Sequence, residues 1–333
     1  MVDASGPFPM ELSKPVVCIV GPTASGKTDV AQLVAQHFGG EVISADSMQV
    51  YRGMDIGTGK IPVEDRIVTH HGFDLVDPGE PYSAALFQSY ARNLFHVLDS
   101  RGSASILAGG TGLYVRAAID DYSFPSGEQL PEDNPVRAHY SAFAEEHGGQ
   151  ALWDLLNKRD PESASLIHPN NVKRTIRAFE LLEIDNTTYA KQHAGFETMR
   201  QFVPAAIFHL DVDPVILASR IDRRVEGMLE SGLIDEIASL IKQGFTNALT
   251  AKEAIGYKEF LPYIAGGCQD RSLLEAAKDQ VKTATRRYAK RQRTWWRNDA
   301  RGIHVSADSG DAHRIADAVI GHLKQDGFGS GSC

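Results

Sequence analysis

Short apolar runs alternate with segments of helical periodicity over most of the 333-residue chain. Runs of this kind, rich in β-branched residues, are typical of buried strands in a parallel sheet. We predict strands at 16–20, 41–45, 73–76, 105–108, 205–212 and 302–306. Helical periodicity follows at 29–35, at 84–98 behind an N-capping Ser83, and after Asp213 and Pro214. The pattern predicts an α/β fold in which helices flank a parallel sheet.

One block of the chain departs from this alternation. Residues 120–135 are rich in proline, aspartate, glutamate and glycine, which marks a boundary. From 136 to about 200 the pattern is helical, with no convincing strand, and a strand pattern returns at 205–212. We therefore predict an all-helical subdomain inserted into an α/β core. The predicted organisation is an N-terminal extension at 1–14, a core at 15–130 and 201–325, inserted helices at 131–200 and a flexible tail at 326–333.

Eight residues between the first strand and the first helix match the phosphate-binding pattern G-x-x-x-x-G-K-[ST] in full. They are Gly21, Pro22, Thr23, Ala24, Ser25, Gly26, Lys27 and Thr28. A strand, loop and helix of this kind direct backbone N–H groups and the helix dipole at an anion. Lys27 adds a positive charge, and the Thr28 hydroxyl is the expected ligand of a phosphate-bound Mg²⁺. The motif predicts a P-loop NTPase-like sheet and a phosphate-bearing substrate, without saying which one.

Polar and glycine-rich segments follow the other predicted strands. Asp46 comes after the second strand, and we expect it near the phosphate loop because the carboxyl ends of parallel strands line the ligand crevice. A turn or helix cap is the alternative role for such an aspartate. Residues 53–60 are too glycine-rich for a regular element and predict a loop over the site. Thr111, in the glycine-rich turn at 109–114, is a candidate for contact with substrate.

The charge of the chain is unevenly distributed. Although the net charge is −9, residues 278–297 contain eight lysines and arginines against one aspartate. Within this segment one stripe of the predicted helix is apolar. Because its residues repeat at helical spacing, we interpret it as core packing in preference to a platform for base stacking. The apolar stripe consists of Val281, Ala284, Tyr288 and Trp295, and a basic stripe of Arg286, Lys290, Arg293 and Arg297. On an otherwise acidic chain, this concentration of cations indicates a surface that binds the phosphate backbone of a nucleic acid. The neighbouring aromatic side chains can stack on unpaired bases.

Two further groups of cations have two interpretations each. Lys173, Arg174 and Arg177 lie off the apolar side of a predicted helix, where a solvated face is the simplest explanation and a functional role is the alternative. Arg220 and Arg224 lie four residues apart on a common helical face. For that pair, surface ion pairing and a functional role are both open.

The remaining composition excludes several classes of protein. The three cysteines, Cys18, Cys268 and Cys333, form no C-x-x-C pair, so we expect neither a disulfide framework nor a zinc site. The first fifteen residues are unlike a secretory signal, and no apolar run approaches membrane-spanning length. We predict a cytoplasmic monomer with no membrane partner.

Eight segments in a fixed order carry a more specific signal than the phosphate loop alone. They are GPTASGKT at 21, DSMQVYRGMDIGTGK at 46, DPGEPYSA at 77, GGTGLY at 109, HPNNVKRTIRA at 168, RIDRRVEGML at 220, AIGYKE at 254 and TRRYAKRQRTWWR at 285. In this order the chain resembles the bacterial tRNA dimethylallyltransferases from about 25 to 300. Two departures, Ile61 between Lys60 and Pro62 and Trp296 where phenylalanine is common, involve no residue expected in the chemistry.

The resemblance implies transfer of a dimethylallyl group from dimethylallyl diphosphate to N6 of adenine 37, next to the tRNA anticodon. Asp46 would accept the amine proton, because adenine N6 is a poor nucleophile. The loop at 21–28, with Lys27, Mg²⁺ at Thr28 and both Arg220 and Arg224, would stabilise the leaving diphosphate. Thr111 resembles the family threonine that contacts the base, which must turn out of the anticodon loop to enter the pocket.

The tRNA contacts implied by the resemblance extend over several segments of the chain. They are Asp46, Ser47, Met48, Gln49, Thr111, Arg137, Lys173, Arg174, Arg177, Lys290, Arg291, Gln292, Arg293, Trp295 and Arg297.

Three other functions are compatible with parts of the pattern. A P-loop small-molecule kinase has the same strand, loop and helix and often a carboxylate near the acceptor. An adenylate prenyltransferase acting on free nucleotides would not need the basic helix. An RNA-binding module without activity would leave Asp46 and Lys27 without a purpose.

Overall fold

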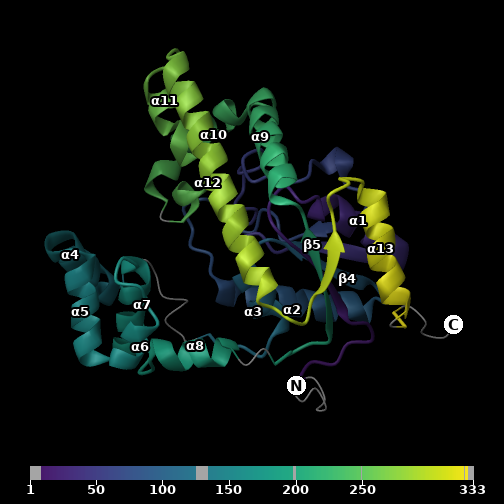
Figure 1. Ribbon diagram of the computed structural model, residues 1–333, viewed down its shortest axis with the longest axis horizontal. Helices are drawn as coiled ribbons and strands as arrows, with labels where there is room; N and C mark the ends of the chain where they lie inside the picture. Colours follow the sequence, from purple (N-terminus) through teal and green to yellow (C-terminus); the bar gives the residue numbers. More distant parts are fainter. Residues whose placement is uncertain (1–8, 125–133, 198–199, 249, 326, 329–333) are drawn as a thin grey trace. The chain divides into compact units, whose positions relative to one another are not determined.

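The computed structural model describes residues 9–124, 134–197, 200–248, 250–325 and 327–328. Most of the predicted N-terminal extension, most of the predicted flexible tail and the middle of the predicted boundary segment lie outside these residues. The chain divides into two compact units (Figure 1). Among the described residues, the larger unit contains those from 9 to 119 and from 203 to 328, and the helical unit contains those from 120 to 202.

The larger unit is built on a six-stranded sheet with the order β3-β2-β4-β1-β5-β6. All the pairings between these strands are parallel. The strands are β1 Val16–Val20, β2 Gly40–Ser44, β3 His70–His71, β4 Ala104–Gly109, β5 Ala205–Asp211 and β6 Ile303–Ser306. The predicted parallel α/β sheet is confirmed, and the strand that precedes the phosphate loop lies in its interior.

One predicted strand is wrong. Residues 73–76 do not form a strand; the edge strand is the short β3, and Val76 makes only an isolated bridge to Tyr51. Gly72 and Asp74 have φ angles of 84° and 55°. Left-handed backbone at two of three positions interrupts an extended strand, so the apolar run continues as a loop.

Helices cover the sheet on both faces. α1 (Lys27–Phe38) and α13 (Ala312–Gln325) pack against each other, and their apolar residues share a core with alternate positions of the strands. The intervening strand positions, such as Cys18 and Leu107, are also buried, as in parallel sheets enclosed on both sides. α2 (Ala84–Ser100) and α3 (Gly112–Ile119) pack together and against β4. The predicted Ser83 cap is confirmed, since its side chain accepts the Leu86 N–H.

Two long helices extend from the carboxyl side of the sheet and lie side by side (Figure 1). α9 (Pro214–Glu230) begins at the predicted Asp213 cap, and α12 (Arg271–Arg297) begins at Asp270. The segments α10 (Leu233–Lys242) and α11 (Leu261–Ala265), with short 3₁₀ turns at Phe245–Asn247, Ala251–Glu253 and Lys258–Phe260, lie between them in the sequence. A further 3₁₀ turn spans Val63–Asp65. α12 contains the whole of the predicted basic segment, residues 278–297.

The helical unit contains no strand among its described residues, apart from an isolated bridge between Asp120 and Gln201. Its helices are α4 Pro135–His147, α5 Gly149–Arg159, α6 Pro161–Ser165, α7 Val172–Glu183 and α8 Tyr189–Glu197. Stacked Tyr140 and Phe179, with ring centroids 3.9 Å apart, lie in the core of the unit beside Leu152 and Leu156. Across the described residues of both units, no helix combines the length and apolarity that crossing a membrane requires.

Candidate active site

The phosphate loop, residues 21–28, connects the end of β1 with the start of α1. Gly26 takes a φ of 84° directly before the helix, a conformation that glycine adopts without strain. The N–H groups of the first helical turn are therefore available to an anion. Lys27 folds back over the loop and donates from Nζ to the Pro22 carbonyl at 2.5 Å. The loop thus has the local geometry that the motif predicted.

The pKa of Lys27 is set by its burial and by two charged neighbours, Arg224 and Asp46. Burial lowers its pKa to about 7, with a further decrease from Arg224 and an opposing increase from Asp46. A large fraction of this lysine is therefore neutral at physiological pH unless an anion is near. Two cations and one carboxylate thus lie close enough to influence one another at the end of the phosphate loop.

Arg224 of α9 connects the phosphate loop with the glycine-rich loop at 53–60. Its Nη1 donates to Thr23 Oγ1 at 3.2 Å, and its Nη2 donates to the Thr58 carbonyl at 3.1 Å. Burial lowers the pKa of the guanidinium below its ordinary value, whereas Asp46 raises it. A partly desolvated guanidinium in this position provides a fixed positive charge for a phosphate.

Arg220 lies one turn before Arg224 and has different partners. Its Nη2 donates to the carbonyls of Ala307 and Asp308, at 2.9 and 2.7 Å, just after β6. Both arginines nevertheless line a cavity of about 550 Å³ together with Lys27. Surface ion pairing was one of the two interpretations of this pair. In the described residues, the hydrogen bonds of the two guanidinium groups go instead to carbonyls and a hydroxyl.

Asp46 lies directly after β2 and begins a turn. Its Oδ1 accepts the N–H of Met48 at 2.9 Å, so the capping role is present in the structure. Thr111, which follows β4, accepts the Ser47 N–H on Oγ1 at 3.2 Å. Gln49 instead turns toward the glycine-rich loop, where its Nε2 donates to the carbonyls of Thr58 and Gly59 at 3.3 and 3.2 Å, while its Oε1 accepts the Ser44 hydroxyl at 2.6 Å. The structure therefore brings Asp46, Ser47 and Thr111 together at the carboxyl ends of β2 and β4.

Two cavities of the larger unit share part of their lining. A cavity of about 70 Å³ is lined by Lys27, Thr28, Ser44 and Gln49 among others, and one of about 470 Å³ by apolar Ile221, Val225, Met228, Ile255 and Val281 among others. Thr23, Asp46, Thr58 and Arg224 line both. A small polar space beside the phosphate loop thus shares its walls with a larger, partly apolar one. This arrangement fits a substrate with a charged end and a short apolar part.

α12 contributes to the site in a way that the sequence did not reveal. Gln292 is buried, and its Oε1 accepts the N–H of Thr23 in the phosphate loop at 2.8 Å. Tyr288 and Arg291 line the larger cavity. Burial raises the pKa of Tyr288 to about 12, with a further increase from Asp46 and opposing contributions from Thr111 and Gln292. Gln292 was predicted as a tRNA contact; in the structure its side-chain oxygen binds the phosphate loop.

The predicted apolar stripe of α12 is correct for Val281 and wrong for Trp295. The buried indole is Trp296, 3% exposed, whereas Trp295 is 36% exposed. Trp296 packs beside the buried His209 of β5, with ring centroids 5.6 Å apart. Of the two neighbouring tryptophans, the one that packs against β5 is therefore Trp296. Trp295 therefore presents an exposed aromatic surface.

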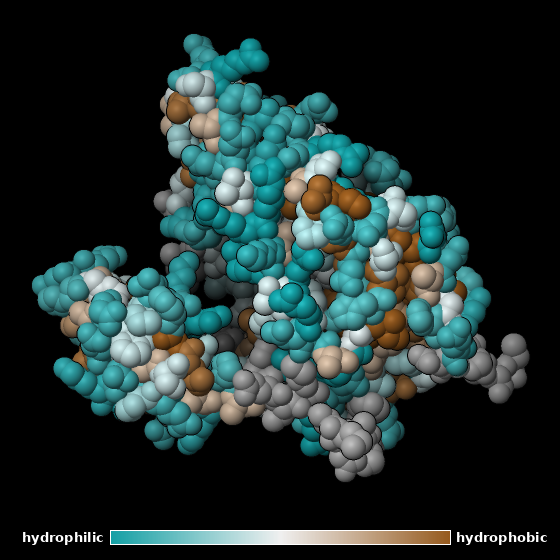
Figure 2. Space-filling model, in the orientation of Figure 1, coloured by the Kyte–Doolittle hydropathy of each residue, from teal (hydrophilic) through white to brown (hydrophobic). Residues whose placement is uncertain are grey.

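The cations of α12 fall into two groups. Lys278 and Lys282 pair with Glu226 of α9, with N–O distances of 2.8 and 2.6 Å, and Arg286 pairs with Asp222. These residues join α12 to α9. The exposed cations further along the helix are Arg287, Lys290, Arg291, Arg293 and Arg297. Figure 2 shows a mainly hydrophilic surface over α12 on the face in view.

The predicted cations of the helical unit also divide into two groups. Arg137 donates through Nε and Nη2 to the two carboxylate oxygens of Glu180, at 2.7 and 3.1 Å, and Arg177 donates to the same group at 3.2 Å. Glu180 is completely buried. These two arginines therefore neutralise a buried carboxylate, whereas Lys173 and Arg174 are exposed on α7.

The predicted magnesium ion can be tested against the residues present. In the part of the chain that the structure describes, no group of three or more His, Cys, Asp or Glu side chains could hold a metal ion. Mg²⁺ bound to a substrate phosphate needs only one or two protein oxygens and water. The Thr28 and Asp46 side chains line the same 70 Å³ cavity. These residues therefore fit a Mg²⁺ whose ligands are mainly phosphate oxygens and water. They do not fit a metal site formed by protein ligands only.

Comparison with known proteins gives a consistent result. Residues 49–299 match the family model of IPP transferase, and residues 14–71 match that of isopentenyl transferase. A tRNA dimethylallyltransferase of Geobacillus thermodenitrificans is 43% identical over 288 residues, 86% of this chain and 89% of that protein. One from Halalkalibacterium halodurans is 44% identical over 290 residues, 87% of this chain and 90% of that protein.

Solved structures show the same relationship. The full-length tRNA isopentenylpyrophosphate transferase of Bacillus halodurans has a TM-score of 0.65 and 40% identity, covering 94% of this chain and 98% of that one. A eukaryotic dimethylallyltransferase acting on tRNA has a TM-score of 0.79 and 27% identity, covering 96% of this chain and 81% of that one. With a family model matched over most of its length and relatives above 40% identity, this chain belongs to the IPP transferase family.

Proposed function

We propose that the protein transfers a dimethylallyl group from dimethylallyl diphosphate to N6 of adenine 37 in the tRNA anticodon loop. The observation that carries this proposal is the shared lining of the two cavities. A carboxylate, Asp46, and a guanidinium, Arg224, lie between a small polar space at the phosphate loop and a larger, partly apolar one. A prenyl donor needs both kinds of space, and its nucleophile needs a nearby base.

Asp46 acts as the general base in this proposal. The bond between adenine N6 and the allylic carbon forms as the carbon–oxygen bond to diphosphate breaks, and the amine proton passes to the Asp46 carboxylate. The Met48 N–H that Asp46 accepts holds the carboxylate in one orientation. Thr111, hydrogen-bonded to Ser47 beside it, is in position to contact the acceptor base.

The leaving diphosphate is stabilised by the loop at 21–28, Lys27 and Arg224. A diphosphate beside Lys27 would favour the charged lysine, whose pKa burial otherwise lowers to about 7. Arg220 shares with these two cations the lining of the 550 Å³ cavity. When bound through Thr28 and the phosphates, Mg²⁺ would neutralise part of the charge that develops on the leaving group.

The tRNA would bind to exposed cations, with the adenine turned out of the anticodon loop into the larger cavity. On α12 these are Lys290, Arg291, Arg293 and Arg297, with Trp295 as an exposed aromatic group. Arg291 also lines the cavity, so it would lie at the entrance used by the base. On the helical unit, Lys173 and Arg174 are the exposed members of the predicted set, whereas Arg137 and Arg177 bind Glu180.

The test is transfer to a defined anticodon stem-loop with adenines at positions 36, 37 and 38. The purified protein is incubated with dimethylallyl diphosphate and Mg²⁺, and the product is located by mass spectrometry. Prenylation at position 37 is expected. Phosphate transfer from ATP without prenylated RNA would indicate a kinase, and a preference for free AMP over the stem-loop would indicate a free-nucleotide prenyltransferase.

A further inference from the structure

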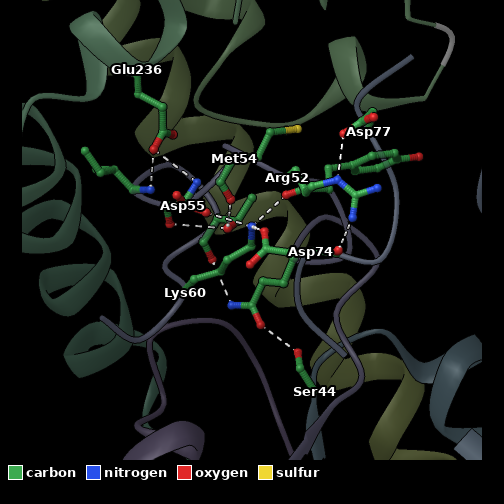
Figure 3. Close-up of polar contacts among 12 residues, drawn as sticks. Ser44, Arg52, Met54, Asp55, Lys60, Asp74, Asp77 and Glu236 are labelled. Carbon is green, nitrogen blue, oxygen red and sulfur yellow. Dashed lines mark hydrogen bonds and ion pairs between the residues drawn. The ribbon is translucent and has the colours of Figure 1, made fainter. Parts of the chain in front are cut away.

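The glycine-rich loop at 53–60 is held from α10 by one carboxylate (Figure 3). Glu236 Oε2 accepts the N–H groups of Asp55 and Ile56 at 3.0 and 2.7 Å. Its Oε1 accepts the N–H of Gly57 at 3.2 Å and the hydroxyl of Tyr257 at 2.7 Å. Three consecutive backbone N–H groups that converge on one anion form a concave binding site, here occupied by a side chain of the same chain.

Tyr257 fixes the same loop by packing. Its ring is fully buried, and a Cβ placed on Gly57 would come within 2.4 Å of it. Only glycine allows this approach. Burial raises the pKa of Tyr257, as does the neighbouring Glu236 carboxylate. The tyrosine therefore stays protonated and donates its hydroxyl to Glu236.

Lys60 holds the far end of the loop. Its buried Nζ donates to the Tyr51 carbonyl at 2.6 Å and pairs with Asp55 and Asp74 at 2.7 and 2.6 Å (Figure 3). The loop is thus fixed at both ends by charged groups with several hydrogen bonds each. The segment between them, Ile56 to Gly59, has little freedom to change its position.

Two carbonyl groups of that segment, those of Thr58 and Gly59, face the proposed active site. Arg224 donates to the Thr58 carbonyl at 3.1 Å, and its other nitrogen reaches Thr23 of the phosphate loop. Gln49 donates from Nε2 to the carbonyls of Thr58 and Gly59, at 3.3 and 3.2 Å. Glu236 is therefore connected to Arg224 through only a few residues of backbone, although it lines neither of the cavities that contain Asp46.

We propose that Glu236 is a positioning residue for prenyl transfer, which fixes the Thr58 carbonyl and through it the guanidinium of Arg224. This inference rests on the proposed function of the site. Without the Glu236 carboxylate, the three N–H groups lose their acceptor and the loop relaxes. Arg224 then loses the support that keeps it beside Thr23, where the leaving diphosphate would bind. A displacement of a charged group by about 1 Å can reduce the rate about 10²-fold.

The first test compares Glu236→Gln with Asp235→Asn, a neighbouring exposed carboxylate of the same helix. Glutamine keeps the size of the side chain but offers one acceptor oxygen and places an NH₂ group toward backbone donors. For Glu236→Gln we expect kcat/KM to fall on the order of 10- to 100-fold. Binding of inorganic diphosphate, measured by calorimetry, should weaken, whereas stem-loop affinity and the activity of Asp235→Asn should match wild type.

A double-mutant cycle separates positioning from general loss of stability. If Glu236 acts through Arg224, the losses do not multiply, and Glu236→Gln in an Arg224→Ala background causes little further loss. Multiplicative losses, or unchanged diphosphate binding in Glu236→Gln, would overturn the proposal. An inactive wild-type protein would instead refute the proposed function.

Tyr257→Phe provides a second route if Glu236→Gln does not fold. This variant removes only the hydroxyl bonded to Glu236 and keeps the ring against Gly57. We expect a smaller loss in the same direction, again confined to diphosphate binding and turnover. Wild-type kinetics and diphosphate affinity in Tyr257→Phe, with no folded Glu236→Gln protein, would count against the proposal.

Discussion

Diphosphate binding should draw a proton onto Lys27. In the free protein burial lowers the pKa of this lysine to about 7. The neutral fraction of the lysine therefore grows as the pH rises through this range. A bound diphosphate favours the ammonium form and raises the pKa again. Binding should then take up a proton at Lys27, and the uptake should increase from pH 7 to pH 8 towards a limit of about one.

Calorimetric titration with inorganic diphosphate, in two buffers of different ionisation enthalpy, measures this uptake. Lys27→Met is the matched control, because it removes the charge and keeps a side chain of similar length. Protons that the diphosphate itself takes up or releases contribute equally in both proteins. The difference in proton uptake between wild type and Lys27→Met therefore belongs to the lysine.

The affinity should also depend on pH with a definite sign. Above pH 7 the neutral fraction of Lys27 grows, so wild-type affinity should fall by up to about tenfold per pH unit, relative to Lys27→Met. Below pH 7 the lysine is already charged and this dependence should disappear. Equal proton uptake by wild type and Lys27→Met would refute the reasoning.

Three further predictions concern other parts of the molecule. Asp46→Ala should slow transfer by about 10² to 10⁴ with tRNA affinity nearly kept, and unchanged turnover would remove Asp46 from the base role. Arg291→Ala should lower the slope of log affinity against log salt by roughly one. Arg286→Ala is the matched control, because Arg286 pairs with Asp222 and should not contact a phosphate. Equal slopes in the two variants would show that Arg291 makes no phosphate contact. Glu180→Gln should lower the free energy of unfolding by about 2 kcal/mol, since the buried group loses the charge that Arg137 and Arg177 bind, and denaturant unfolding would show no change if the ion pairs contribute nothing.

Local signals predicted most of the fold. Five of the six predicted strands are present, together with the Ser83 and Asp213 caps, because apolar periodicity and capping chemistry act over a few residues. The strand at 73–76 failed because Gly72 and Asp74 have left-handed φ angles, and the Asp74 side chain pairs with Lys60, a residue outside the run. Apolar composition alone carries no information about such a contact.

The site itself was only partly predictable. The sequence predicted that Asp46 lies near the phosphate loop, because a motif and a strand end indicate their positions without knowledge of other elements, and Asp46 lines the same cavity as Lys27 and Thr28. Gln292 was assigned to the RNA, whereas its oxygen binds Thr23, 269 positions away in the sequence. One signal in the sequence could have indicated this contact. Gln292 lies on the same side of the helix as the apolar Val281 and Tyr288, and a buried side-chain amide needs a polar partner.

The sequence by itself determined the parallel α/β plan, the phosphate loop and the concentration of positive charge on one helix. These features depend on residue type and local spacing. The tertiary structure alone decided which cations are available: Arg286 pairs with α9, Arg137 and Arg177 with Glu180, and Arg224 with two loops. Charge is a property of a residue, but its availability depends on partners that only folding brings within hydrogen-bonding distance.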